Sequence, residues 1–333
     1  MSALCRVLIA AVLAVSVYAP GVYAQSDPLY TQSWMVPTLY NPAAAGSTDW
    51  LRIRGVGRMQ WVGIENAPKS FTAAADIPFK LLDKRWGGGV NLTQEGIGLF
   101  SNTYVNGQLA GRIKTIKGGH LMAGIQIGYF GSSFRGSEVY IPNDDDYHES
   151  NDPSIPTQDV GGGTIDFGAG LMYYHSKWHT GISVTHAASP KVKLNTKGTS
   201  SSSATQDNHE FETYAKRTLY LTAGSNIAIK NTLIELQPDI ILATDLNTFS
   251  GVISARGLYN KMFFAGLAYR WNDAVAVSLG AEIKNFTLGY SYEIPTSKLL
   301  KASSGSHEVV VGYRLKLDFS GKNRNRHRSI RLM

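Results

Sequence analysis

The most regular stretch of the chain, residues 308–319, reads Glu-Val-Val-Val-Gly-Tyr-Arg-Leu-Lys-Leu-Asp-Phe. Every odd-numbered residue from Val309 to Phe319 is apolar, whereas the even-numbered residues are charged or small, apart from Val310. Successive side chains of a β-strand point to opposite faces, so this alternation predicts a strand with one apolar face. The same alternation recurs upstream, most clearly in residues 263–271, 275–281 and 286–294.

The composition indicates the same class of fold. The 333 residues include 34 Gly, 17 Tyr and 12 Phe, and only 17% of them are charged. Abundant glycine and aromatic residues without long apolar runs are typical of all-β architectures. Beyond the first 24 residues no run of 18 apolar residues occurs, so the sequence predicts no transmembrane helix.

Residues 1–24 have the organisation of a secretory signal peptide. Arg6 gives the positive start, residues 7–17 form the apolar core, and Val22-Tyr23-Ala24 is a small-residue cleavage site. The core is too short for a membrane anchor, which needs roughly 20 apolar residues. The only cysteine, Cys5, lies within this peptide. The mature chain is therefore predicted to have no disulfide, no thiolate metal site and no cysteine nucleophile.

Fourteen predicted strands account for most of the remaining sequence. They cover residues 49–59, 70–79, 86–98, 102–114, 119–132, 163–174, 177–187, 216–230, 232–244, 249–259, 262–271, 274–284, 286–295 and 307–319. The longest connections, residues 133–162, 188–215 and 296–306, all fall on one side, together with residues 60–69. Outer-membrane barrels combine an even strand number with short turns at one end and long loops at the other, and a soluble sandwich does not explain this parity. We therefore predict an all-β transmembrane outer-membrane β-barrel of about 14 antiparallel strands.

The domain organisation follows from the same parity. Residues 49–319 form the barrel, residues 25–48 a periplasmic N-terminal segment, and residues 320–333 a basic periplasmic tail. Within the segment, Pro42 favours extended backbone at Asn41, and Gly46 is suited to a positive-φ turn. We expect the stretch from Tyr40 to Gly46 to fold into or across the periplasmic mouth and close it as a plug.

Several charged residues are expected to face the lumen. Alternation places Arg52, Arg54 and Arg58 of the first strand on the inward face, with Asp76 of the second strand opposite them, and Arg256 also points inward. Buried charges need partners. Mixed signs therefore favour a lumen filled by ion pairs or a plug, and the alternative is a wet channel lined by the same charges.

The positive charge is concentrated at the C-terminus. The net charge is +7, and the tail supplies five cations: Lys322, Arg324, Arg326, Arg328 and Arg331. The body is near neutral, which argues against a broadly basic nucleic-acid-binding protein. The tail and the lysines at the short turns would form a positive periplasmic rim suited to an acidic partner or to peptidoglycan. The alternative is ordinary turn charge followed by a disordered end.

Two stretches contain residues that are suited to metal binding or to catalysis. Residues 138–152 are acidic, but their spacing does not match a calcium-binding loop, so calcium binding stays an open alternative. Ser176 lies between His175 and His179, which suggests an outer-membrane hydrolase, but the chain has no G-x-S-x-G elbow. We therefore expect no catalytic residue, no metal site and no cofactor.

Motifs spread over residues 26–115 carry a family resemblance. They are Asp27-Pro28-Leu29-Tyr30-Thr31-Gln32, Leu39-Tyr40-Asn41-Pro42 through Gly46, Arg58-Met59-Gln60-Trp61, Pro68-Lys69-Ser70, Asp76-Ile77-Pro78, and Glu95 to Phe100. In order and spacing this region resembles the PorP/SprF family of type IX secretion system outer-membrane proteins. The motif residues singled out as a possible site are Tyr40, Asn41, Pro42, Gly46, Arg58, Gln60, Trp61, Pro68, Asp76 and Pro78.

The resemblance implies a barrel in the outer-membrane lipid of a Bacteroidetes-type cell. It also implies a role in the export of cargo proteins that carry a C-terminal sorting domain, without catalytic residues or cofactor. The partners it implies are PorE and the PorK/PorN ring in the periplasm, with PorM as a further candidate. The predicted function is a non-enzymatic anchor or coupling component, and the alternative is an outer-membrane channel for small or hydrophobic solutes.

Overall fold

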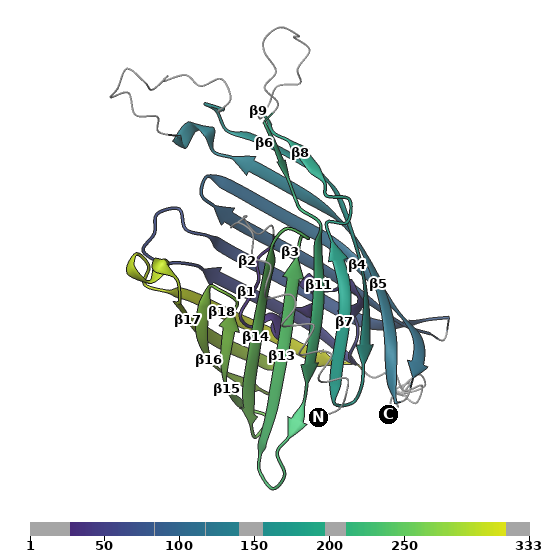
Figure 1. Ribbon diagram of the computed structural model, residues 1–333. Helices are drawn as coiled ribbons and strands as arrows, with labels where there is room; N and C mark the ends of the chain where they lie inside the picture. Colours follow the sequence, from purple (N-terminus) through teal and green to yellow (C-terminus); the bar gives the residue numbers. More distant parts are fainter. Residues whose placement is uncertain (1–26, 83, 117, 140–155, 197–210, 318–333) are drawn as a thin grey trace, which may run out of the picture.

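The computed structural model describes residues 27–82, 84–116, 118–139, 156–196 and 211–317 (Figure 1). The predicted signal peptide and the basic tail from Lys322 to Arg331 lie outside the described residues, as does most of the acidic stretch 138–152. Among the described residues, no helix is long and apolar enough to cross a membrane.

Fourteen of the described strands form one closed antiparallel barrel, which confirms the predicted fold. They are β1 (Trp50–Met59), β2 (Lys69–Leu81), β3 (Lys84–Ile97), β4 (Phe100–Ile116), β5 (Gly119–Phe134), β6 (Val160–Tyr174), β7 (Trp178–Thr185), β11 (Thr218–Ser225), β13 (Ile234–Thr244), β14 (Phe249–Tyr259), β15 (Phe263–Arg270), β16 (Ala274–Ile283), β17 (Phe286–Pro295) and β18 (Ser306–Lys316). Each strand pairs with the next around the ring, and β1 pairs with β18 to close it. The predicted strand 216–230 is interrupted at Asn226 and continues as the short β12 (Ile227–Ala228).

The smaller elements lie in the connections and before β1. A two-stranded sheet of β8 (Lys191–Lys193) and β10 (Glu212–Tyr214) lies between β7 and β11, and β9 (Asn195–Thr196) pairs with β6. Three short helical turns precede the barrel: η1 (Ser33–Met35), α2 (Pro37–Tyr40) and η2 (Pro42–Ala44). Two more, η3 (Gly136–Glu138) and η4 (Lys298–Lys301), lie in connections.

The two ends of the barrel differ in their connections. At one end, which we call the short-turn end, strands are joined by brief segments such as residues 175–177 and 284–285. At the other, the long-loop end, the connections include residues 135–159, 186–217 and 296–305. Figure 1 shows β4, β5 and β6 rising past β7 and β11 at the long-loop end. The reason is strand length, because β4 to β6 have 17, 16 and 15 residues whereas β7 and β11 have 8 each.

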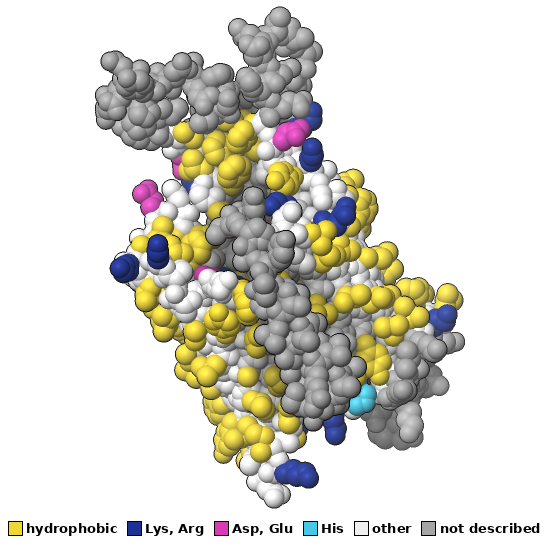
Figure 2. Space-filling model, in the orientation of Figure 1, with side chains coloured by type: hydrophobic (Ala, Val, Ile, Leu, Met, Phe, Trp, Pro, Cys, Tyr) yellow, Lys and Arg dark blue, Asp and Glu magenta, His cyan; other side chains and the backbone are white. Residues whose placement is uncertain are grey.

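The outward face of the barrel is apolar. Side chains such as Ile125, Leu267 and Leu279 are about 60% exposed in the isolated chain, at 62%, 63% and 58%. Figure 2 shows hydrophobic side chains spread over the barrel wall between the two ends. Water would disfavour this much exposed apolar surface, so it is the surface that contacts lipid.

The inner face of the tall wall carries an aromatic cluster. Tyr104 and Phe130 stack at 4.7 Å, and Phe134 lies above them. Phe211, just before β10, packs on Phe134 at 5.1 Å, and Val192 of β8 belongs to the same cluster. The small β8–β10 sheet therefore covers the inner side of the wall at the long-loop end.

Candidate functional site: the filled lumen

Residues 27–48, which we call the N-terminal segment, lie inside the barrel. Tyr30, Val36 and Ala43 are completely buried. Tyr40 is also buried: its hydroxyl accepts a hydrogen bond from the Tyr30 N–H at 2.9 Å, and its carbonyl accepts one from Ser183 of β7 at 2.5 Å. The segment thus packs against the barrel wall along its length.

The local sequence explains why the segment folds into short turns. Asn41 has extended backbone (φ −145°, ψ 112°), as expected for a residue before proline, and its side chain accepts a hydrogen bond from the Ala43 N–H. The Asn41 amide also donates to the carbonyls of Leu171 and Ile182 on β6 and β7, at 3.1 and 3.2 Å. One side chain therefore both caps the turn and fastens it to two strands.

Two glycines in the wall make room for the segment. A side chain at Gly124 would collide with the backbone of Pro42 and Ala43, and one at Gly87 would collide with the backbone of Ala45 and Gly46. Gly46 itself has φ +61°, a backbone conformation that glycine adopts without strain. These close approaches set the position of the segment near the short-turn end.

An ion-pair cluster holds the segment at the short-turn end. Asp76 of β2 lies 2.6 Å from Arg52 and 2.8 Å from Arg54, both on β1. Its carboxylate also accepts the Gly46 N–H at 2.9 Å, and Arg52 donates to the Ala44 carbonyl at 3.0 Å. The charges of the wall are thereby linked directly to the backbone of the segment.

A second cluster lies farther along the lumen. Arg58 of β1 makes two hydrogen bonds to Glu293 of β17, at 2.5 and 2.7 Å. Glu308 of β18 accepts the backbone N–H groups of Thr31 and Gln32, each at 2.8 Å. The Thr31 hydroxyl also donates to Glu293.

Two further arginines hold the same part of the segment. Arg270 of β15 donates to the Leu29 carbonyl at 2.6 Å and lies 3.2 Å from Glu293. Arg256 of β14 lies over the ring of Trp34 at 3.4 Å from its centroid, a cation–π contact. Every one of these charged groups thus has a partner, as burial requires.

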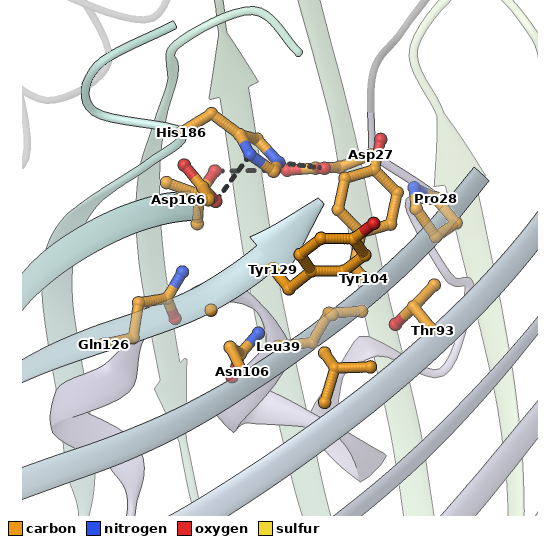
Figure 3. Close-up of a pocket in the computed structure, with 13 residues that line it drawn as sticks. Asp27, Pro28, Leu39, Thr93, Tyr104, Asn106, Gln126, Tyr129, Asp166 and His186 are labelled. Atoms are coloured by element: carbon orange, nitrogen blue, oxygen red, sulfur yellow. Dashed lines mark hydrogen bonds and ion pairs between the residues drawn. The ribbon is translucent and has the colours of Figure 1, made fainter. Parts of the chain in front are cut away.

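A third cluster contains Asp27, the first residue that the structure describes. Figure 3 shows His186 between two carboxylates. Its Nε2 lies 2.8 Å from Asp27 of the segment and its Nδ1 lies 2.8 Å from Asp166 of β6. Asp27 also accepts hydrogen bonds from the hydroxyls of Tyr220, at 2.7 Å, and Thr185, at 3.1 Å.

The protonation of this cluster favours the charged pair. Burial raises the pKa of the Asp27 carboxyl, but the charge and the hydrogen bond of His186 outweigh it, so the pKa is lowered overall. His186 lies just past the end of β7. Burial lowers the pKa of its imidazole, but the charge of Asp27 and the hydrogen bond to Asp166 outweigh burial and raise the pKa to about 10. At neutral pH the imidazolium therefore holds both carboxylates.

Two small cavities lie beside the segment. The cavity in Figure 3, which is lined by Asp27, Leu39, Tyr104, Gln126 and His186 among others, has a volume of about 30 Å³. A second cavity between Leu29 and β13 has about 20 Å³. Each has room for about one or two water molecules. Among the described residues, no group of His, Cys, Asp and Glu has the arrangement of a metal site.

The predicted site residues separate into two groups. Tyr40, Asn41, Pro42, Gly46, Arg58, Asp76 and Pro78 meet in or beside the lumen, where Gly46 packs against Pro78. Gln60, Trp61 and Pro68 instead lie in the β1–β2 connection at the long-loop end, where the Gln60 N–H donates to the Pro68 carbonyl at 2.9 Å. The predicted lumen charges Arg52, Arg54, Arg58, Asp76 and Arg256 all contact the segment or the carboxylates around it.

The segment extends farther than the plug of Tyr40 to Gly46 that was expected at one mouth. Gly46 lies near the short-turn end, but Asp27 and Thr31 contact residues at the long-loop ends of β7, β17 and β18. The segment therefore runs through the lumen instead of across one opening. Its path follows from the carboxylates and amides that line the inner face at successive depths.

Sequence reasoning missed three partners. Asp27 was recognised only as part of a motif, His186 was not considered, and Asp166 was not linked to either of them. Glu308, by contrast, could have been found, because it pairs with Arg58 in the register of β1 and β18. No signal in the sequence connects Asp27 with His186, because 159 residues separate them.

The geometry defines a class of protein: a 14-stranded membrane β-barrel with its own N-terminal segment packed into the lumen. The chain belongs to the PorP/SprF family, described as type IX secretion system membrane proteins, whose sequence signature matches residues 22–313. The family makes the chain a component of that secretion system and associates it with the secretion machinery. No curated protein sequence matches the chain.

Solved structures of other proteins are similar to this chain at low sequence identity. The CymD monoaromatic hydrocarbon channel is 10% identical with a TM-score of 0.51, covering 85% of this chain and 93% of that one. The Pseudomonas putida toluene transporter TodX is 10% identical with a TM-score of 0.47, covering 88% and 96%. The Acinetobacter baumannii outer membrane protein Omp33 is 7% identical with a TM-score of 0.43, covering 81% and 100%. At such identities the likeness to CymD concerns the fold alone.

Proposed function

We propose that the protein is a non-enzymatic outer-membrane component that anchors or couples the type IX secretion machinery during export of proteins with a C-terminal sorting domain. The observation that supports this proposal is the N-terminal segment itself. It is tied to the wall by Asp76, Glu308 and His186 at three points along its length. A lumen occupied in this way suits an attachment point better than a conduit.

The short-turn end is proposed to face the periplasm, since outer-membrane barrels have short turns on that side. Exposed lysines gather there: Lys84, Lys177, Lys230, Lys261 and Lys284. Such a rim suits an acidic surface on the periplasmic partners, for which PorE, the PorK/PorN ring and PorM are the candidates. The tail from Lys322 to Arg331 would add to the same charge.

The proposal is tested against the channel alternative by deletion and conductance. We expect a deletion strain to lose export of the sorting-domain cargo while its uptake of small solutes is unchanged. Purified protein in planar bilayers is expected to show no steady, large conductance. A steady conductance together with lost solute uptake would instead establish a channel.

A disulfide between the segment and the wall tests whether the segment must leave the lumen for export. The Thr38 hydroxyl donates to the Asn91 side chain at 2.9 Å, so T38C with N91C would tie the segment to β3. The matched control is T38C with L92C, because Leu92 points outward on the same strand. An attachment role predicts normal cargo export by the locked protein. Loss of export that is restored by a reductant would contradict it and favour a conduit.

A further inference from the structure

A cavity of about 540 Å³ lies at the long-loop end, and none of its lining residues belongs to the N-terminal segment. It is formed between the connection that precedes β11 and the connection from β13 to β14. Ser189, Tyr214 and Arg217 line it from the first connection, and Asp245, Leu246 and Asn247 line it from the second. Its volume lies within the range of small-molecule binding sites.

The carboxylate of this cavity, that of Asp245, is already occupied. Asp245 Oδ1 accepts hydrogen bonds from the backbone N–H groups of Asn247 and Thr248, at 3.0 and 2.6 Å. Asp245 Oδ2 lies 3.2 Å from the ammonium group of Lys216. Burial raises the pKa of the Asp245 carboxyl, but the hydrogen bonds from Thr248, Asn247 and Lys216 outweigh it, so the pKa is lowered overall. The single carboxylate is thus committed to holding the loop and one lysine.

The hydrogen-bond donors of this cavity, in contrast, are only partly paired. Arg217 uses its Nε to bond the Ala187 carbonyl at 2.8 Å and its backbone N–H to bond the Ser189 oxygen at 3.3 Å. Within the described part of the chain, the terminal nitrogens of Arg217 and the hydroxyl of Tyr214 have no protein acceptor. The Ser189 hydroxyl hydrogen is likewise left to a ligand or to water. The groups left for an occupant are therefore donors and a cation, which suit a ligand with acceptors and a negative charge.

The position of the cavity indicates where the occupant comes from. Arg217 precedes Leu219 and Leu221 on the outward face of β11, and both leucines are exposed. Leu246 and Tyr214 are exposed at the same rim, at 74% and 56%. Figure 2 shows Lys and Arg side chains next to hydrophobic ones near the upper ends of β8 and β11. Cations and tyrosine at the edge of an apolar band lie at the level of lipid headgroups.

We propose that this cavity binds the phosphate of an anionic lipid headgroup. Arg217 presents a planar fork to the phosphate oxygens, Ser189 donates its hydroxyl, and Lys216 adds charge. Leu246 and Tyr214 contact the apolar part of the same lipid. This lipid binding is independent of the role in secretion proposed above.

The test uses the full mature chain purified in a non-ionic detergent, with binding measured by native mass spectrometry. The probes are dioctanoyl phosphatidic acid, dioctanoylglycerol, which has the same chains without the phosphate, and inorganic phosphate. R217Q removes the guanidinium group and S189A removes the hydroxyl. K191Q is the matched control, because Lys191 is an exposed cation of β8 outside the cavity lining.

We expect phosphatidic acid to bind, with dioctanoylglycerol and inorganic phosphate each at least about tenfold weaker. R217Q should weaken phosphatidic acid binding by about tenfold, as loss of a charge-assisted hydrogen bond does, and S189A by less. K191Q should leave binding within about twofold of the wild type, since an exposed charge contributes little. Equal weakening by K191Q and R217Q would overturn the site. Equal binding of inorganic phosphate would overturn the lipid as its ligand.

Discussion

Arg58 of β1 and Glu293 of β17 form a two-point ion pair inside the barrel, although β18 lies between their strands. Glu308 of the intervening strand β18 lies 3.5 Å from the same guanidinium group. One arginine thus holds two buried carboxylates, and these in turn bind Thr31 of the N-terminal segment. The wall and the segment share a single charge network.

The first prediction concerns this network. R58M leaves Glu293 and Glu308 buried close together without the cation that they share. Removing one partner of a buried ion pair costs about 3–5 kcal/mol. We expect a loss of that size in the free energy of unfolding, measured by urea titration of the detergent-solubilised barrel. R135M is the control, because the exposed pair of Arg135 with Glu138 contributes about 0–1 kcal/mol. Equal losses in the two variants would show that the network does not stabilise the barrel.

The sequence predicted the barrel wall well because each strand must keep one face toward lipid and one toward the lumen. That constraint produces the alternation of Val309, Val311 and Tyr313, and it also brings Arg54 and Asp76 to one inner face. Strand ends were less accurate, and Asn226 interrupts a stretch that alternation alone treats as continuous.

The interior was harder to predict. Which side chains meet inside a barrel depends on how far the segment reaches along the axis, and no periodicity encodes that depth. Asp27 therefore gave no sign that it would reach His186, and Trp34 gave none that it would lie under Arg256. The stretch from Tyr40 to Gly46 was expected at a mouth, and the contacts of Asp27 and Thr31 extend farther along the lumen.

The second prediction is a pH dependence at Asp27 and His186. The raised pKa of His186, about 10 against 6.5, means that its contribution is complete below pH 6.5 and is lost as the pH rises through 10. The lowered pKa of Asp27 means that its contribution is complete above pH 3.8 and is lost as the pH falls through the lowered value. The attachment of the segment should therefore be strongest between about pH 4 and 6.5.

D27N checks this dependence. Other charged and titratable groups around the pair are Asp166, Glu95 and the hydroxyls of Tyr104 and Tyr220. We expect D27N to lower the free energy of unfolding at pH 6 by about 3 kcal/mol, as for a broken buried pair, and by much less at pH 11. If D27N lowers the free energy of unfolding by the same amount at both pH values, the pair of Asp27 and His186 is not the source of the pH dependence.

The third prediction tests which face meets lipid. Ile125 lies on the outward face near the middle of β5, and Ser133 lies on the same face toward the long-loop end. In a lipid bilayer, I125R is expected to cost about 2–4 kcal/mol and S133R about 0–1 kcal/mol, because the cost of a charge falls toward the interface. Reversible unfolding from lipid vesicles measures both. Equal costs would mean that the membrane boundary is not where the apolar band places it.

The last prediction tests the close approach of the segment to the wall. A side chain at Gly87 would collide with the backbone of Ala45, whereas one at Gly88, its outward-facing neighbour, would only touch Phe79 at 3.6 Å. Overpacking costs about 1–3 kcal/mol, so G87V should shift the docked segment toward release by about tenfold or more, while G88V should not.

The readout is maleimide labelling of a cysteine introduced by A44C, because Ala44 is fully buried when the segment is docked. Labelling should be much faster in A44C with G87V than in A44C alone, and A44C with G88V should match A44C alone. Valine suits a β-strand at both positions, so strand propensity does not distinguish the two variants. If G87V and G88V accelerate labelling equally, barrel loosening and not displacement of the segment is the cause, and the close packing of Gly87 against the segment is not what holds it in place.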